Sequence, residues 1–262
     1  MPIAITRPVS DSLGQCELTH LARTPIDVEL ARAQHGAYER VLAGLGCRIE
    51  RLPAEHGLPD AVFVEDTAIV LDELALIARP GAPSRRPEVS SAAEALARYR
   101  DLVHVKAPGT LDGGDVLRVG RTIYVGLSLR SNQAAVEQMA ALLAPLGYRV
   151  QGVAVTGCLH LKSAVTQVAP ETLLIQREWV DADAFERQAL IDVDPGEPYA
   201  ANTLLIGDSV IYAAAYPRTQ ARLEAYGIDV HAVDVSELAK AEGAVTCCSL
   251  VLGGRPGSAV VG

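Results

Sequence analysis

Five polar residues that could take part in chemistry follow one another at similar distances along the chain. These marker residues are Asp66, Asp112, His160, Asn202 and Cys247, with successive gaps of 46, 48, 42 and 45 residues. A thiol, an imidazole and two carboxylates in one site would suit nucleophilic attack on a cation, with the histidine moving protons. A guanidinium is the cation that fits best, because it is planar, permanently charged and pairs with carboxylates through two hydrogen bonds.

Each of these signals also has a purely structural interpretation. A cysteine in the apolar stretch VTCCSLVL is more often a buried packing residue than a nucleophile. His160 alternates with Lys162 between leucines, which is also typical of a surface histidine on an edge strand. The LDGGD stretch that contains Asp112 is also typical of a hairpin turn. The chemistry therefore depends on a fold that brings the marker residues together.

The elements that would position the marker residues repeat along the chain. Near each marker, a β-branched run is followed by a turn, a second apolar run, usually a helical pattern, and a short strand, which predicts ββαβ units. Gly147 and Gly227 stand where helix C-caps are expected. The helical patterns cover residues 85–100, 132–147, 181–191 and 218–227.

The last unit, around Cys247, ends too soon to contain a helix. The N-terminal stretches IAITRP, DVELARAQHGAYERVLAGLG and CRIERLP supply the missing strand, helix and strand. We therefore expect one α/β domain over residues 1–262, in which five pseudo-symmetric units form a ring closed by the N- and C-terminal segments. A sequential α/β sheet is the alternative. The last residues, from about 253 to 262, are expected to form a flexible tail.

The composition of the chain argues against several classes of protein. Its 262 residues carry a formal net charge of −9, which does not favour binding to nucleic acid or to an anionic membrane. No stretch approaches the roughly 20 apolar residues of a membrane span. The five cysteines are odd in number and irregularly spaced, unlike a disulfide framework, and the N-terminus lacks a signal-peptide pattern. These features predict a cytoplasmic protein with reduced thiols.

Several stretches together resemble one enzyme family. LPDAVFVEDTAIV, ARPGAPSRR, TLDGGDVLRVGRTIYVGLSLRSNQ, LHLKS, AAN and EGAVTCCS are similar to the dimethylarginine dimethylaminohydrolases, which belong to the guanidino-group-modifying enzymes. The likeness extends over nearly the whole chain. It implies a five-bladed α/β propeller and hydrolysis of Nω-methylated arginine to citrulline and methylamine or dimethylamine, through a covalent thiouronium on cysteine. It also implies that no cofactor and no metal is needed.

The resemblance further implies roles for individual positions. Cys247 would be the nucleophile, His160 the general acid and base, and Asp112 the carboxylate of the triad. The implied substrate-binding positions are Asp66 for the guanidinium, Asp60, Glu65 and the backbone of Leu18 for the α-amino end, Arg85 and Arg130 for the α-carboxylate, and a carbonyl near Ala241. Arginine deiminase or a related guanidino-modifying enzyme is the alternative function, followed by a non-catalytic binding protein. The expected partner is a small molecule, and a homodimer is allowed but not required.

Two adjacent thiols, Cys247 and Cys248, need to be distinguished. Neighbouring Cα atoms lie about 3.8 Å apart, which is closer than ordinary disulfides prefer. Neighbouring side chains of a strand point to opposite faces, so only one thiol could face the site. The family pattern selects Cys247, which leaves Cys248 to pack in the core. Carboxylates beside Cys247, those of Asp66 and Asp112, should raise the pKa of its thiol in the empty site.

Overall fold

The computed structural model describes residues 1–253, so that the expected tail falls almost entirely outside the described residues. Within this range, fifteen strands form five three-stranded sheets. The first sheet pairs β15 (Leu250–Leu252), β1 (Ile3–Thr6) and β2 (Arg48–Arg51), and the second pairs β3 (Ala68–Val70), β4 (Leu74–Ile77) and β5 (Asp101–His104). The third pairs β6 (Val116–Val119), β7 (Thr122–Leu127) and β8 (Arg149–Ala154), and the fourth pairs β9 (Val165–Ala169), β10 (Thr172–Ile175) and β11 (Ala189–Asp192). The fifth pairs β12 (Thr203–Ile206), β13 (Ser209–Ala213) and β14 (Asp229–Val233).

Every sheet has the same internal arrangement. The first strand runs antiparallel to the middle strand, and the third strand runs parallel to it. Antiparallel neighbours can be joined by a tight turn, whereas the parallel neighbour needs a crossover, which contains an α-helix in four of the five sheets. The predicted ββαβ units are therefore the five blades of a propeller.

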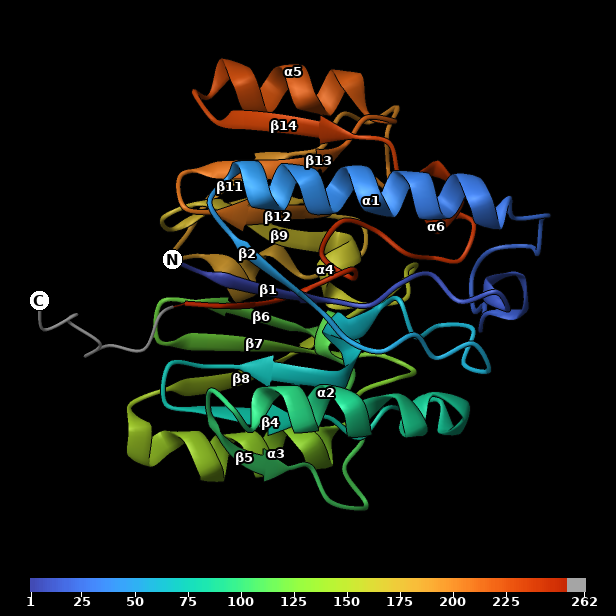
Figure 1. The fold of residues 1–262 in the computed structure, drawn as a ribbon. Helices are drawn as coiled ribbons and strands as arrows, with labels where there is room; N and C mark the ends of the chain where they lie inside the picture. The colour runs from blue at the N-terminus through green and yellow to red at the C-terminus, as the bar shows by residue number, and fades with distance from the viewer. Residues whose placement is uncertain (254–262) are drawn as a thin grey trace, which may run out of the picture.

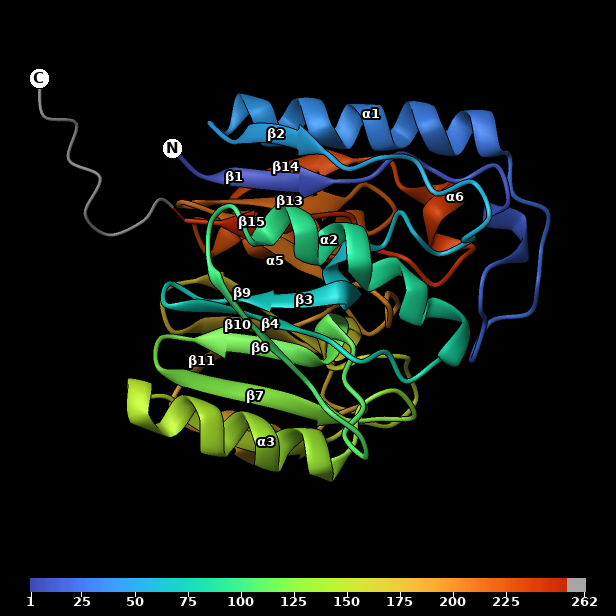
Figure 2. The same ribbon diagram turned by 60° about the horizontal axis from the view of Figure 1, so that its bottom comes forward.

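The ring is closed by pairing between the two ends of the described chain. Ile3 of β1 faces Leu252 of β15 in an antiparallel register, and Ile5 faces Leu250. Figure 1 shows β1 at the N-terminal end of the chain within the stack of strands, and Figure 2 shows β15 beside it. This pairing confirms the predicted closure, and it gives β1 a partner strand on each side, β15 on one and β2 on the other.

The five inner strands surround a common axis. A cavity of about 220 Å³ is lined by residues of β3, β6, β9, β12 and β15 together. One lining residue from each of these strands is Ile69, Leu117, Gln167, Leu204 and Val251. Since all five first strands contribute to one cavity, the sequential-sheet alternative is wrong and the ring is confirmed.

The long helices lie on the outside of the ring (Figures 1 and 2). The helices are α1 (Val28–Gly44), α2 (Val89–Leu96), α3 (Gln133–Leu143), α4 (Leu161–Ala164), α5 (Pro217–Ala225) and α6 (Ser236–Ala239). Asp27 caps α1 and Asn132 caps α3, each accepting a hydrogen bond from a backbone N–H of the first turn. Gly147 and Gly227 have φ of 79° and 81°, which confirms both predicted helix ends.

The fourth blade differs from the prediction. Residues 181–191 were expected to be helical, but the structure has a 3-10 helix at Ala182–Phe185 followed by strand β11. Phe185 is fully buried, with its ring 4.7 Å from that of Tyr124. The stretch is short, and pairing of β11 with β10 outweighs its weak helical preference. Within residues 1–253, none of the helices is long and apolar enough to cross a membrane.

Candidate active site

The five marker residues occupy equivalent places in the five blades. Each stands a few residues before an inner strand, where the chain enters its blade. Asp66 precedes β3, Asp112 precedes β6, His160 precedes β9, Asn202 precedes β12 and Cys247 precedes β15. Because the inner strands surround one axis, their starting ends gather these side chains at one end of the ring.

A small pocket at this end collects most of the predicted site residues. Its lining includes Asp60, Asp66, Arg85, Arg130, His160, Ala241 and Cys247. It also includes Glu17, Phe63, Leu159, Glu242 and Gly243, which the sequence did not single out. Larger cavities lie elsewhere, one of them along the ring axis, but the ionisable and nucleophilic groups converge on this smaller one.

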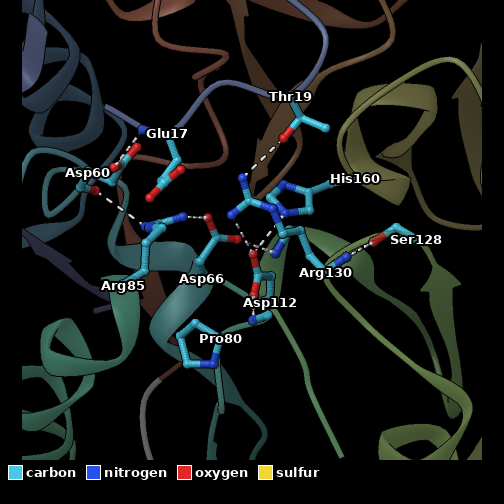
Figure 3. Close-up of polar contacts among 12 residues, drawn as sticks. Glu17, Thr19, Asp60, Asp66, Pro80, Arg85, Asp112, Ser128, Arg130 and His160 are labelled. Carbon is cyan, nitrogen blue, oxygen red and sulfur yellow. Dashed lines mark hydrogen bonds and ion pairs between the residues drawn. The ribbon is translucent and has the colours of Figure 1, made fainter. Parts of the chain in front are cut away.

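A buried carboxylate–imidazole pair stands at the edge of this pocket (Figure 3). His160 Nε2 lies 3.1 Å from Asp112 Oδ2, and both side chains are buried. Asp112 Oδ1 accepts a hydrogen bond of 2.9 Å from the backbone N–H of Gly81. His160 precedes the short helix α4 and does not lie on an edge strand, so the interpretation as a surface histidine is wrong.

The two glycines of LDGGD are needed for close approach. A Cβ atom at Gly114 would lie 2.5 Å from His160 Nδ1 and 2.9 Å from Asp66 Oδ1. The backbone N–H of Gly114 also donates to Asp66 Oδ1 at 2.8 Å. Gly113 approaches the backbone carbonyl of Glu65 even more closely. Both glycines belong to a 3-10 helix and neither has positive φ, so the hairpin-turn interpretation is wrong.

The charges of the site stabilise one another. Burial lowers the pKa of His160, but the carboxylates of Asp66, Asp115 and Asp112 outweigh this effect and raise it to about 9. Burial raises the pKa of Asp66, but His160, Arg85 and the N–H of Gly114 outweigh it and bring the pKa to about 2. At neutral pH His160 is therefore an imidazolium that faces the ionised carboxylate of Asp66.

Three polar side chains of this cluster lie close together. Ligand atoms of Asp66, Asp112 and His160 all lie within 4.8 Å of one another. Asp112 already pairs with His160, and Asp66 with Arg85. These groups therefore already have protein partners of opposite charge.

Cys247 lies in a turn before β15 and not in a strand as predicted. Its side chain is partly exposed to the pocket, whereas Cys248 is fully buried in the core. Burial, followed by the charges of Glu65 and Asp66, raises the pKa of the Cys247 thiol to about 12. The predicted direction of the pKa shift agrees with the structure, but the second carboxylate is Glu65 and not Asp112.

Glu65 and Leu18 are not among the residues that line this pocket, and the role implied for the Leu18 backbone stays a prediction. The Glu65 carboxylate pairs with Lys162 Nζ at 2.6 Å and accepts from Thr246 Oγ1 at 2.7 Å. Glu65 lines the axial cavity and not the catalytic pocket. Leu18 is not among the residues that line the pocket, and its side chain packs against the core around α1. Thr246 directly precedes Cys247, so Glu65 supports the turn that carries Cys247.

Asn202 holds the same turn from the neighbouring blade. Its Oδ1 accepts from the backbone N–H of Thr246 at 3.1 Å, and its Nδ2 donates to Thr246 Oγ1 at 3.0 Å. It also donates to the backbone carbonyl of Lys162 in α4. The fourth marker therefore ties the turn of Cys247 to the helix that follows His160.

The two arginines of the pocket have different surroundings (Figure 3). Arg85 is buried, donates to Asp66 Oδ2 at 2.6 Å, and pairs with Glu88 through Nε and Nη2. Its Nη2 also donates to the backbone carbonyl of Phe63. Among the described residues, 1–253, the Arg130 side chain donates one hydrogen bond, from Nη2 to Thr19 Oγ1. Its Nη1 also forms a longer ion pair, 3.7 Å from Asp112 Oδ2. Arg130 thus keeps more donors for a ligand than Arg85 does.

Glu242 is a pocket residue that the sequence did not indicate. Its φ is 57°, which is unusual for a residue other than glycine. Its carboxylate accepts hydrogen bonds from the backbone N–H groups of Thr19, His20 and Leu21. No local pattern in EGAV signals this, because the bonds join segments more than 200 residues apart.

Comparison with known proteins gives a consistent assignment. The profile of the family described as "N,N dimethylarginine dimethylhydrolase, eukaryotic" matches residues 21–195. The N(G),N(G)-dimethylarginine dimethylaminohydrolase of Streptomyces coelicolor is 41% identical, over 95% of this chain and 96% of that protein. The enzyme of the same name from Pseudomonas aeruginosa is 36% identical, over 88% of this chain and 91% of that protein.

Solved structures agree with these relatives. The dimethylarginine dimethylaminohydrolase of Pseudomonas aeruginosa, solved as a cysteine-to-serine mutant complexed with citrulline, superposes with a TM-score of 0.91. It is 35% identical and the match covers 95% of this chain and 98% of that chain. The N-terminal domain of a cyanobacterial arginine dihydrolase is 18% identical with a TM-score of 0.87, which shows the shared fold. From the profile and the relatives together, the chain belongs to the dimethylarginine dimethylaminohydrolase family.

Proposed function

We propose that this protein hydrolyses Nω-methylated arginine to citrulline and methylamine or dimethylamine. Family membership supports the reaction. The observation that carries the proposal is the meeting of a thiol, an imidazolium–carboxylate pair and a further carboxylate at one small pocket. This set can hold a cation, attack its central carbon and supply a proton to the leaving nitrogen.

The substrate cation is held by complementary charge. Asp66 stays ionised, since its pKa is about 2, and lines the pocket beside Cys247. Its carboxylate therefore pairs with the N–H groups of the guanidinium. Arg130 holds the α-carboxylate at the other end, and Asp60, which also lines the pocket, holds the α-amino group. Arg85 acts mainly as the counter-ion of Asp66 and Glu88.

The first half of the reaction transfers the amidine carbon to sulfur. The arriving cation lowers the pKa of the Cys247 thiol, which loses its proton to solvent. The thiolate adds to the guanidinium carbon and forms a C–S bond. His160, already protonated, donates a proton to the alkylated nitrogen. The C–N bond then breaks, methylamine or dimethylamine leaves, and a cationic thiouronium remains on Cys247.

The second half releases citrulline. His160 is neutral after donating its proton, so it can accept one from a water molecule that attacks the thiouronium carbon. The new C–O bond forms, the C–S bond breaks with its electron pair returning to sulfur, and the urea group of citrulline results. Cys247 takes up a proton again, and His160 is an imidazolium ready for the next substrate.

A panel of guanidino compounds tests the proposal. Purified protein is incubated with arginine, monomethylarginine, asymmetric dimethylarginine and agmatine, and both citrulline and released amine are measured. We expect citrulline and alkylamine in equal amounts from the methylated arginines, with Cys247→Ser as the inactive control. Absence of citrulline from every compound would defeat the enzymatic function. Ammonia and citrulline from arginine alone would instead favour a deiminase.

We also propose that residues 1–262 form a single catalytic domain and that the protein works in the cytoplasm. Closure of the ring by β1 and β15 supports the first point, since strands from opposite ends of the described chain belong to one blade. The five free cysteines support the second, because reduced thiols persist in a reducing compartment. A homodimer stays a prediction, to be checked by light scattering during size-exclusion chromatography.

A further inference from the structure

We propose that the buried carboxylate of Asp115 is a positioning residue that holds three active-site segments in register. Asp115 is fully buried and does not line the catalytic pocket. The proposal rests on the proposed function for its kinetic consequences, but its structural consequences can be measured without substrate.

The first segment that Asp115 holds is the one that carries His160. Asp115 Oδ1 accepts a hydrogen bond of 2.9 Å from the backbone N–H of Leu161, the residue after His160. The backbone of Gly126 also lies close to this oxygen, because a Cβ atom at that position would be 2.5 Å from it. The start of α4, and with it the His160 ring, is therefore fixed against Asp115.

The second and third segments are reached through two serines. Asp115 Oδ2 accepts from Ser128 Oγ at 2.6 Å and from Ser131 Oγ at 2.7 Å. Ser131 Oγ in turn accepts from the backbone N–H of Asp112 at 3.0 Å. Ser128 Oγ accepts from the backbone N–H of Arg130 at 3.0 Å. One carboxylate thus connects the backbones of the general acid, its partner carboxylate and the pocket arginine.

The direction of these hydrogen bonds requires an ionised carboxylate. Each serine hydroxyl has one proton and already accepts from a backbone N–H, so its proton is directed to Asp115. Leu161 also donates. Three donors therefore meet two carboxylate oxygens, and an asparagine at position 115 would direct its NH₂ either toward the two serine hydroxyls or toward the Leu161 N–H. Asp115→Asn is nearly the same size but cannot reproduce the network.

The charge of Asp115 also acts on His160 directly. Burial raises the pKa of Asp115 above its usual value, and His160, Ser128, Ser131 and the Leu161 N–H offset only part of that effect. Asp115 in turn is among the carboxylates that raise the pKa of His160. The other charges near this pair are Asp66 and Asp112, with Arg85 and Arg130 beside those two. Removal of one of three carboxylate charges lowers the pKa of His160.

The decisive experiment compares Asp115→Asn with a matched control, Glu197→Gln. Glu197 is also a buried carboxylate that accepts backbone N–H bonds, from Arg218 and Thr219, but it lies outside the catalytic pocket. The titration of the His160 imidazole is followed by NMR in substrate-free protein, and kcat and KM are measured for the best substrate. Circular dichroism checks that each variant is folded.

For Asp115→Asn we expect a lower His160 pKa and a fall in kcat of about 100-fold, because a small displacement of catalytic groups has costs of that size. Glu197→Gln should leave both quantities unchanged. A folded Asp115→Asn variant with an unaltered His160 titration and unaltered kcat overturns the proposal. If the wild type forms no citrulline, the proposed function fails, while the NMR titration still decides this inference.

A second variant tests the positioning role of Asp115 if Asp115→Asn does not fold. The double variant Ser128→Ala with Ser131→Ala keeps the carboxylate charge and the bond to Leu161 but removes the links to Arg130 and Asp112. We expect a lower kcat with a His160 pKa close to that of the wild type. Wild-type kcat in the folded double variant would overturn the positioning role.

Discussion

His160 Nε2 lies 3.1 Å from Asp112 Oδ2 in a buried pair, so this one carboxylate both orients the imidazole and stabilises its charge. For Asp112→Asn we expect a loss in kcat of about 100-fold or more, which is the usual contribution of a positioned general acid. The His160 pKa should also fall below its value of about 9. A rate that needs the imidazolium declines as pH rises through that pKa, so the alkaline limb of the kcat profile should move to lower pH. Asp112→Glu, which keeps the charge, is the control and should leave that limb near its original pH.

Cys247 and Cys248 should respond in opposite ways to substitution. Cys247→Ser should abolish turnover, because a serine hydroxyl in this site is a far weaker nucleophile than a thiolate. Cys248→Ala should retain most of the activity and lose about 1 kcal/mol of stability as a small buried group is removed. Mass spectrometry after incubation with a slow substrate should locate the covalent adduct on Cys247. An adduct on Cys248 would contradict the assignment.

The thiol of Cys247 should be protonated at rest and ionise when a cation binds. Burial and the charges of Glu65 and Asp66 raise its pKa to about 12, so the fraction of thiolate at neutral pH is small. A bound guanidinium offsets these charges and lowers the pKa. Ultraviolet absorbance of the thiolate, titrated with and without an inert guanidine ligand, checks this. Equal apparent pKa values in the two titrations would exclude substrate-assisted ionisation.

Arg85 and Arg130 should be distinguishable by stability and by KM. Arg85→Met leaves the buried carboxylates of Asp66 and Glu88 without their partner, and loss of one member of such a set costs about 3–5 kcal/mol. Chemical denaturation measures this loss.

Arg130→Met should instead raise KM by roughly 10- to 100-fold, because a charge-assisted hydrogen bond contributes about 1.5–3 kcal/mol. A decarboxylated analogue of the substrate provides the control, since its KM should be the same in wild type and in Arg130→Met. A KM change of equal size for both compounds would argue against a contact between Arg130 and the α-carboxylate.

Glu242 should control how firmly residues 19–21 are held, and with them Thr19, the hydrogen-bond partner of the pocket residue Arg130. Its carboxylate accepts three backbone N–H bonds from that segment, from a backbone with φ of 57°. Glu242→Gly removes the carboxylate and suits the backbone, whereas Glu242→Ala removes it and keeps the strain. Both should raise KM and speed hydrogen exchange at the amides of Thr19, His20 and Leu21. Unchanged exchange at these amides in both variants would contradict the role of Glu242.

The parts of the fold that repeat were predictable from the sequence. The marker spacing and the alternation of strand and helix patterns indicated five blades, and the early end of the fifth unit indicated closure by the N-terminus. The helix expected at residues 181–191 was wrong, since pairing with β10 is a tertiary effect that local periodicity does not report.

The residues that could take part in the chemistry were more predictable than the hydrogen bonds and ion pairs that hold them in place. Cys247, His160, Asp112 and Asp66 could be named from residue types and from a family pattern. The contacts of Glu65 with Lys162 and Thr246 could not be, since they cross from blade to blade. Glu242 gave no sequence signal, because its role depends on a backbone conformation and on partners from the opposite end of the chain.

The antiparallel pairing of β1 with β15 has a consequence for the order in which the protein becomes active. β15 and Cys247 belong to the last part of the described chain, yet they complete a blade begun by the first strand. During synthesis, four blades can be made while the nucleophile is still inside the ribosome. With Cys247 as the proposed nucleophile, we expect a nascent chain to be inactive until its C-terminal segment emerges and docks on β1, and a product terminated before residue 247 to be inert.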